Sequence, residues 1–282
     1  MKTRAIADLT QLSDADFFSE VSTGLGHILK SAIGLEQSAA LLANQGHTRG
    51  YRILLSMVEE EAAKFLILLD AVRCPRTPPE QVSRHLKRIY SHLAKGIYAE
   101  ACDWKPSTFG ELLEYMENER REFYLDGPSD VDWIFWNRIL QEREHKIYVD
   151  YVDTDEGHVW FTPPEDDPDD LWLIYSSSPL QLAQALRDSG CTTPESLEVI
   201  AKLWRPVQMT SNYRWVDLRA LNIRTLQKLD NLGLLCEQPQ DVYAAITDRW
   251  TFPLYSAELK LARVKQSALR KIQEQWSPDY WW

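Results

Sequence analysis

A single row of apolar residues at helical spacing constrains this chain more than any other feature. The residues lie mostly three or four positions apart, so they share one face of an α-helix. They are Tyr51, Leu54, Leu55, Val58, Ala62, Phe65, Leu66 and Leu69. Arg73 and the prolines at 75, 78 and 79 end the pattern. Because a helix with one apolar face must be covered by other elements, the pattern predicts a protein of packed helices.

Similar patterns predict more helices on both sides of this one. Ser13 can cap a long helix that ends near Gly46, and a further helix is expected over residues 81–100. Thr108 with Glu111, and Ser129 with Asp132, have the spacing of capping boxes that begin two more helices. Residues 1 to about 150 therefore predict five helices without an internal strand. The stretches YVDYVD and HVWFT, which follow, can form a short hairpin or an extended segment.

An acidic, proline-rich stretch divides the chain. Nine Asp or Glu residues and no Lys or Arg lie between positions 150 and 170, and PPEDDPDD at 163–170 is typical of a loop. We predict a helical domain over residues 1–155, a connector over 156–170 and a Trp-rich, mainly helical region over 171–282. The expected fold class is all-α. The tryptophans that fill a small core there, or form a partner-facing patch, are Trp204, Trp215, Trp250, Trp276, Trp281 and Trp282.

Composition excludes several classes of function. The net charge of −11 argues against broad, sequence-independent binding of DNA, although it leaves room for a small nucleic-acid pocket. No apolar run approaches the roughly 20 residues that span a membrane, and the N-terminus lacks the apolar core of a secretion signal. The four cysteines are far apart, and nucleotide-binding glycine motifs and metal-ligand spacings are absent. We therefore expect a cytoplasmic protein without membrane contact, metal or cofactor.

Arg138 and His145 are the candidate catalytic residues. Seven residues turn a helix by about 700°, so both side chains leave the same face. An arginine can hold a phosphate, and a histidine can move a proton near neutral pH. Together they could cleave RNA without a metal, as the ribose 2′-OH attacks the adjacent phosphate. Asn137 and Arg143 adjoin the pair as candidate substrate-binding residues.

The alternative interpretation of this segment is an ordinary hydrated helix surface. Glu142, Glu144 and Lys146 lie among the candidate residues, and such a mixture of charges is typical of a solvent-exposed face.

A second group of basic residues follows the predicted helix over 81–100. It is the most concentrated basic surface in this acidic chain and comprises His85, Arg88, His92 and Lys95. Arg88, His92 and Lys95, with Lys64 of the preceding helix, are candidates for holding a phosphate-bearing ligand. The alternative is that they pair with Glu59 or Glu61, whereas Glu60 is expected to face away. Lys64 can pair with Glu60 or Glu61. A carboxylate beside the basic row would form a buried ion pair that fixes how two helices dock.

Three stretches of the chain together resemble one known family. They are residues 54–73 with Glu60-Glu61-x-x-Lys64, residues 85–98 with His92-x-x-Lys95, and residues 123–153 with Arg143 and Tyr148-Val149-Asp150. In this order and spacing they resemble the AbiV family of abortive-infection proteins, whose helical core is grouped with the HEPN superfamily. The resemblance covers roughly residues 20 to 165.

The resemblance implies a HEPN-like helical bundle, a role in bacterial anti-phage defence and a homodimer. RNA and a phage-encoded activator are the further partners, and Glu60 and Glu61 are structural supports. Many HEPN proteins are metal-independent ribonucleases with an Arg, four to six residues and a His, and Arg138 and His145 match the longest spacing. Ile139 replaces the usual polar residue after the Arg, and Ala63 replaces the usual glycine before the lysine motif.

Three functions follow from these observations. The first is a defence effector that arrests growth of the host cell, most simply by cleaving RNA or blocking translation. The second is a toxin without catalysis that binds a host or phage protein through its Trp-rich C-terminal part and the acidic connector. The third is a DNA-binding regulator, because residues 218–235 resemble the recognition helix and exit of a winged helix.

Overall fold

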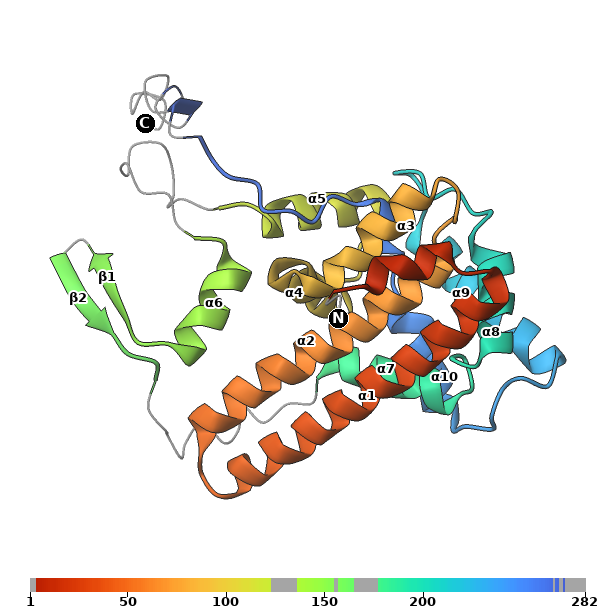
Figure 1. Cartoon of the computed structure of the whole chain (residues 1–282), viewed down its shortest axis with the longest axis horizontal. Helices are drawn as coiled ribbons and strands as arrows, with labels where there is room; N and C mark the ends of the chain where they lie inside the picture. Colours follow the sequence, from red (N-terminus) through yellow and green to blue (C-terminus); the bar gives the residue numbers. More distant parts are fainter. Residues whose placement is uncertain are drawn as a thin grey trace.

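A computed structural model describes residues 4–122, 136–154, 157–164, 177–265, 267, 268 and 271. These residues are mainly helical with one two-stranded sheet, which confirms the predicted all-α class (Figure 1). None of the described helices is both long and apolar enough to cross a membrane. The longer helices are α1 (Asp14–Asn44), α2 (Thr48–Arg73), α3 (Pro79–Leu86), α4 (His92–Ala101), α5 (Phe109–Glu119), α6 (Arg138–Ile147), α7 (Ser178–Asp188), α8 (Pro194–Trp204), α9 (Trp215–Asn231) and α10 (Gln240–Arg249).

Helices α1 and α2 form a long antiparallel hairpin that organises the bundle (Figure 1). The hydroxyl of Ser13 caps α1 by accepting a hydrogen bond from the Asp16 amide, and Gly46 turns the chain at φ +79°. Every residue of α2 from Phe65 to Arg73 is buried. This half of α2 is covered on several sides, because α1, α4, α7 and α8 all pack against α2.

The helix predicted over residues 81–100 is interrupted. After α3 the chain makes a 3-10 turn, η2 (Lys87–Tyr90), and Ser91 is extended at φ −98° and ψ 118°. The Ser91 hydroxyl accepts from the Ala94 amide and so caps α4. A serine that competes for the backbone in this way favours a new helix start over continuation, and the apolar spacing alone did not indicate it.

Helix α6 and a β-hairpin lie on one side of the bundle (Figure 1). The helix predicted from Ser129 has its first part outside the described residues, and the described helix begins only at Arg138, because Asn137 caps it at ψ 131°. Strands β1 (Asp150–Thr154) and β2 (Gly157–Phe161) form the predicted hairpin, in which Tyr151 lies opposite Trp160.

The helices that follow the acidic stretch join the core of the first ones. Helices α7 and α8 pack against α1 and α2, and buried residues from both parts form one hydrophobic cluster. Trp204 and Trp250 are buried 5.2 Å apart and fill this core, whereas Trp276, Trp281 and Trp282 lie outside the described residues. The predicted boundary at 156–170 therefore separates stretches of sequence, not two hydrophobic cores. Residues 232–265 contain no strand, so α9 lacks the wing of a winged helix.

A buried ion pair ties the last described segment to α2. The carboxylate of Asp70 accepts from Nε of Arg73 at 2.9 Å, from the Tyr98 hydroxyl at 2.7 Å and from the Leu254 amide at 2.9 Å. The Arg73 guanidinium donates to the Thr251 carbonyl and lies over the rings of Trp204 and Trp250, 4.5 and 5.0 Å from their centroids. Each charge therefore has several partners away from water, as a buried pair requires.

Candidate functional site

The three sequence motifs meet at the carboxylate of Glu60. One oxygen of Glu60 on α2 accepts from Nδ1 of His92 at 2.8 Å and from Nε of Arg143 at 2.9 Å. The other oxygen accepts from Nζ of Lys95. One carboxylate thereby joins α2, α4 and α6. The expectation that Glu60 faces away, and that Glu59 or Glu61 pairs with the basic row, is wrong for His92 and Lys95, because α4 and α6 cover a second face of α2.

The surroundings of Glu60 favour its ionised form. Burial acts to raise its pKa, but the hydrogen bonds and charges of Lys95 and His92 outweigh burial and lower the pKa. The side chain of Lys95 is only 6% exposed, so Glu60 provides the counter-charge of a buried cation. The cluster is consequently an ion-pair network that docks helices.

The predicted basic surface is largely buried. The Arg88 guanidinium donates to the carbonyls of Leu254 and Ala257, and His85 is completely buried. Of the four basic residues only His92 is substantially exposed, at 45% of its side chain. The break at Ser91 explains this correction, because it places the basic residues of α3 and α4 against different parts of the molecule.

Lys64 and Glu61 pair with each other on α2. Their side chains are 27% and 21% exposed and form an i,i+3 ion pair. Of the two partners expected for Lys64, the structure selects Glu61, since Glu60 is occupied by the cluster above.

His85 is expected to make stability depend on pH. Its Nε2 bonds to the Ile67 carbonyl at 2.8 Å, so this nitrogen carries the hydrogen, and Nδ1 faces a donor of Arg88. Burial is the main cause that lowers the pKa of His85 to about 4. The negative charge of Asp70 acts to raise this pKa, and the positive charge of Arg88 acts to lower it. In the unfolded chain the pKa is about 6.5. The unfolded state therefore binds the proton first, and stability is lost as pH falls from 6.5 towards 4, by up to about 1.4 kcal/mol per pH unit.

Urea denaturation between pH 7 and pH 5 measures this effect. His85→Gln keeps a donor for the Ile67 carbonyl but does not titrate, so its stability should fall less steeply than that of the wild type over this range. Equal slopes for the two proteins would exclude His85 as the cause.

Arg138, the first candidate catalytic residue, is surrounded by carboxylates. Its Nη2 donates to both oxygens of Glu100 and to Glu119, each at 2.7 Å, and its Nη1 donates to Glu142 at 3.1 Å. Burial acts to lower the pKa of Arg138, but the bonds to Glu100 and Glu119 raise it. Burial raises the pKa of Glu100, and the negative charges of Glu119 and Glu142 raise it further. The positive charge of Arg138 lowers this pKa but offsets the increase only in part. The single positive charge of Arg138 is shared among three carboxylates. The excess of negative charge around it opposes the approach of a phosphate.

The other candidates beside Arg138 are also engaged. The His145 ring packs on the ring of Phe161 in β2, with centroids 4.3 Å apart, about 10 Å along the helix axis from Arg138. The side-chain amide of Asn137 donates to the carbonyls of Glu119 and Arg121 at 2.6 and 2.9 Å, and its oxygen caps α6. Asn137 therefore positions α6 and has no amide hydrogen left for a substrate.

A cavity of about 290 Å³ lies between α2, α4, α6 and the start of α7. Glu60, His92, Lys95 and Arg143 line it, whereas Arg138 and His145 do not. Beside it α4 and α6 approach closely: a Cβ atom on Gly96 would lie 2.2 Å from Cγ2 of Ile139. The apolar residue at 139 thus packs against the glycine of α4.

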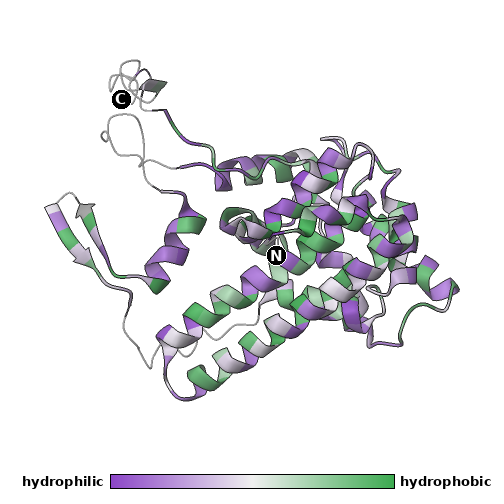
Figure 2. Cartoon of the chain, viewed as in Figure 1, coloured by the Kyte–Doolittle hydropathy of each residue, from purple (hydrophilic) through white to green (hydrophobic). Residues whose placement is uncertain are grey.

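An exposed aromatic surface on the hairpin was not expected from the sequence. Tyr148, Val149, Tyr151, Val159 and Trp160 are all about half exposed or more, and Trp160 reaches 69%. The rings of Tyr151 and Trp160 lie 5.1 Å apart. Figure 2 shows hydrophobic residues on both strands, away from the main bundle. The alternation in YVDYVD and HVWFT indicated strands, but not that exposed side chains would lie on both faces of the hairpin, as those of the adjacent residues Val159 and Trp160 do. We call these five residues the hairpin patch.

Comparison of the chain with models of protein families, with curated proteins and with solved structures found no match. Within the described part of the chain, His, Cys, Asp and Glu side chains form no group of three that could hold a metal ion. The functional interpretation therefore depends on the motifs themselves and on their arrangement around Glu60 and Arg138.

Proposed function

We propose that this protein is an abortive-infection effector that acts in the bacterial cytoplasm, and that it arrests growth by binding and inhibiting a host or phage protein. The observation that carries the choice of binding over RNA cleavage is the environment of Arg138. Its guanidinium donates to Glu100, Glu119 and Glu142. A phosphodiester would have to displace these carboxylates and would meet like charge there.

The role in defence is supported by the arrangement of the motifs. The three stretches that resemble the AbiV family lie far apart in the sequence, yet His92, Lys95 and Arg143 all contact Glu60. The residues that define the three motifs thus share one structural role, which is to dock α6 against α2 and α4. The homodimer, RNA and the phage-encoded activator stay predictions of the resemblance.

The hairpin patch is the surface we assign to the target protein. Tyrosine and tryptophan are common anchors of protein interfaces, because they bury a large apolar area and keep a polar group for hydrogen bonding. The C-terminal tryptophans at 204 and 250 cannot serve in this way, because both are only 1% exposed. We therefore assign the target to the hairpin patch in place of these two tryptophans, whereas Trp276, Trp281 and Trp282 lie outside the described residues.

Growth arrest on expression in bacteria tests this proposal. The double variant Tyr151→Ala/Trp160→Ala should lose growth arrest, because each interface anchor contributes about 2 kcal/mol or more, roughly 30-fold in affinity. The double variant Arg138→Ala/His145→Ala should remain toxic, with cellular RNA intact. Val216→Ala/Leu232→Ala is the matched control, since both of these apolar side chains are at least half exposed elsewhere. Circular dichroism and thermal unfolding establish that each variant folds.

A metal-independent ribonuclease is the second candidate. The observation that favours it is that α6 is held to the bundle in part by ion pairs at Glu60, Glu100 and Glu119, for which a partner can compete. Cleavage of total RNA by the wild type in EDTA, lost in both Arg138→Ala and His145→Ala, would establish this function and exclude the binding mechanism.

A further inference from the structure

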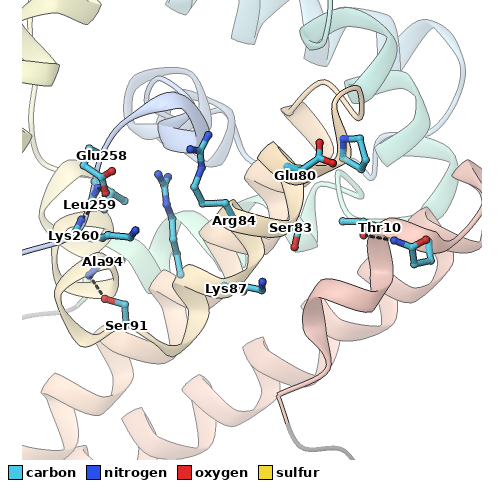
Figure 3. A pocket seen from close by; sticks show the side chains of 13 residues that line it. Thr10, Glu80, Ser83, Arg84, Lys87, Ser91, Ala94, Glu258, Leu259 and Lys260 are labelled. Atoms are coloured by element: carbon cyan, nitrogen blue, oxygen red, sulfur yellow. Dashed lines mark hydrogen bonds between the residues drawn. The ribbon is translucent and has the colours of Figure 1, made fainter.

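A second and larger cavity lies on another part of the molecule. It has a volume of about 550 Å³, and its walls come from the 3-10 helix η1 (Ile6–Gln11), from α3 with η2, and from residues 258–260 (Figure 3). In Figure 3 Arg84 and Lys87 lie between Lys260 at one end of the cavity and Thr10 at the other. Three segments that are distant in the sequence therefore surround one space.

The lining of this cavity is basic although the chain is acidic. It contains Arg84, Lys87, Arg88 and Lys260 but only two carboxylates, against a net charge of −11 for the whole protein. The side chains of Arg84, Lys87 and Lys260 have no ion-pair partner among the residues that the structure describes. One of the carboxylates, that of Glu258, accepts from the amides of Leu259 and Lys260 at 3.0 Å each, both through the same oxygen, and the charges of Lys260 and Arg88 help to lower its pKa.

The fourth basic residue, Arg88, gives the cavity a fixed wall. It is 9% exposed, and its guanidinium donates to the carbonyls of Leu254 and Ala257. These bonds hold the segment that carries residues 258–260 against η2. Arg84, Lys87 and Lys260 are exposed side chains, and they extend into the cavity from segments that Arg88 holds together.

We propose that this cavity binds a small phosphate-bearing molecule of about the size of a nucleotide. Arginine and lysine match phosphate oxygens through charge-assisted hydrogen bonds, and the volume lies within the range of about 300–1,000 Å³ that is usual for small-molecule sites. Pro79, which is exposed, and the small accessible parts of Ala94 and Leu259 line the rest of the cavity. Because the ligand would contact all three segments, it stabilises the folded protein on binding.

Isothermal titration of the full chain at physiological salt tests the proposal with two probes, ATP and inorganic tripolyphosphate. The wild type should bind at one site. Tighter binding of ATP assigns the site to a nucleotide, and equal binding assigns it to the phosphate chain. Arg84→Ala/Lys87→Ala should weaken binding about 100-fold, since each lost charged contact changes affinity roughly 10-fold or more. Thermal unfolding should show that the two probes raise the melting temperature of the wild type more than that of this variant.

The matched control is Arg224→Ala/Lys228→Ala, which also removes one arginine and one lysine, but from exposed positions of α9. It should bind both probes as tightly as the wild type. Failure of the wild type to bind either probe, or equal weakening by the two double variants, would overturn the proposal. These measurements use purified protein and do not depend on growth arrest, so their outcome is separate from that of the proposed function.

Discussion

Asp70→Ala is expected to lower the free energy of unfolding by about 3–5 kcal/mol, because it removes one partner of a buried ion pair. The substitution leaves the guanidinium of Arg73, which is buried, without its carboxylate. It also removes the acceptor for the Tyr98 hydroxyl and the Leu254 amide. Urea denaturation followed by circular dichroism measures the change. Loss of this contact should also release residues 251–254 from α2, which hydrogen exchange detects.

Two further variants make this result specific. Asp217→Ala also removes an Asp that pairs with an Arg three residues away, but at an exposed position where solvent screens the pair, so its effect on stability should be far smaller. Asp70→Asn preserves the shape of the side chain and some of its hydrogen bonds. Its free energy of unfolding should therefore lie between those of Asp70→Ala and the wild type. If Asp70→Ala and Asp217→Ala cost the same, the buried pair does not hold the C-terminal segment.

Glu60→Ala is expected to lower the free energy of unfolding by about 3 kcal/mol. The reason is Lys95, whose side chain is 6% exposed and would remain buried without a counter-charge. His92 and Arg143 are more exposed and can be hydrated instead, so they contribute less to the loss. Because the carboxylate of Glu60 joins α2, α4 and α6, the amides of α6 should also exchange faster in the variant.

A double-mutant cycle isolates the buried charge as the cause. Adding Lys95→Met to Glu60→Ala replaces the unpaired cation by an apolar side chain of similar length, and it should restore most of the lost stability. The exposed pair of Glu198 and Lys202 is the control, since Glu198→Ala should cost about 0.5 kcal/mol or less. A double variant no more stable than Glu60→Ala alone would show that desolvation of Lys95 is not responsible.

Local sequence signals were sufficient for the fold class and for most of the secondary structure. The apolar row from Tyr51 to Leu69 predicted α2, Ser13 and Thr108 marked the starts of α1 and α5, and the alternation after residue 148 indicated the hairpin. These features depend on groups within about four residues of each other, so a linear pattern contains them. The missed start at Ser91 was also local, and its capping serine was the available signal.

The candidate site could not be predicted in the same way, because its geometry depends on how helices cross. Arg138 pairs with Glu100 and Glu119, which lie 38 and 19 residues away. Glu60 contacts Arg143 across 83 residues, and Arg88 bonds to a carbonyl 166 residues away. Periodicity indicated which faces of the helices are apolar, but not that α2 would be covered on more than one side. The charge of each residue can therefore be read from the chain, whereas packing alone determines which charges are neutralised and which remain available to a ligand.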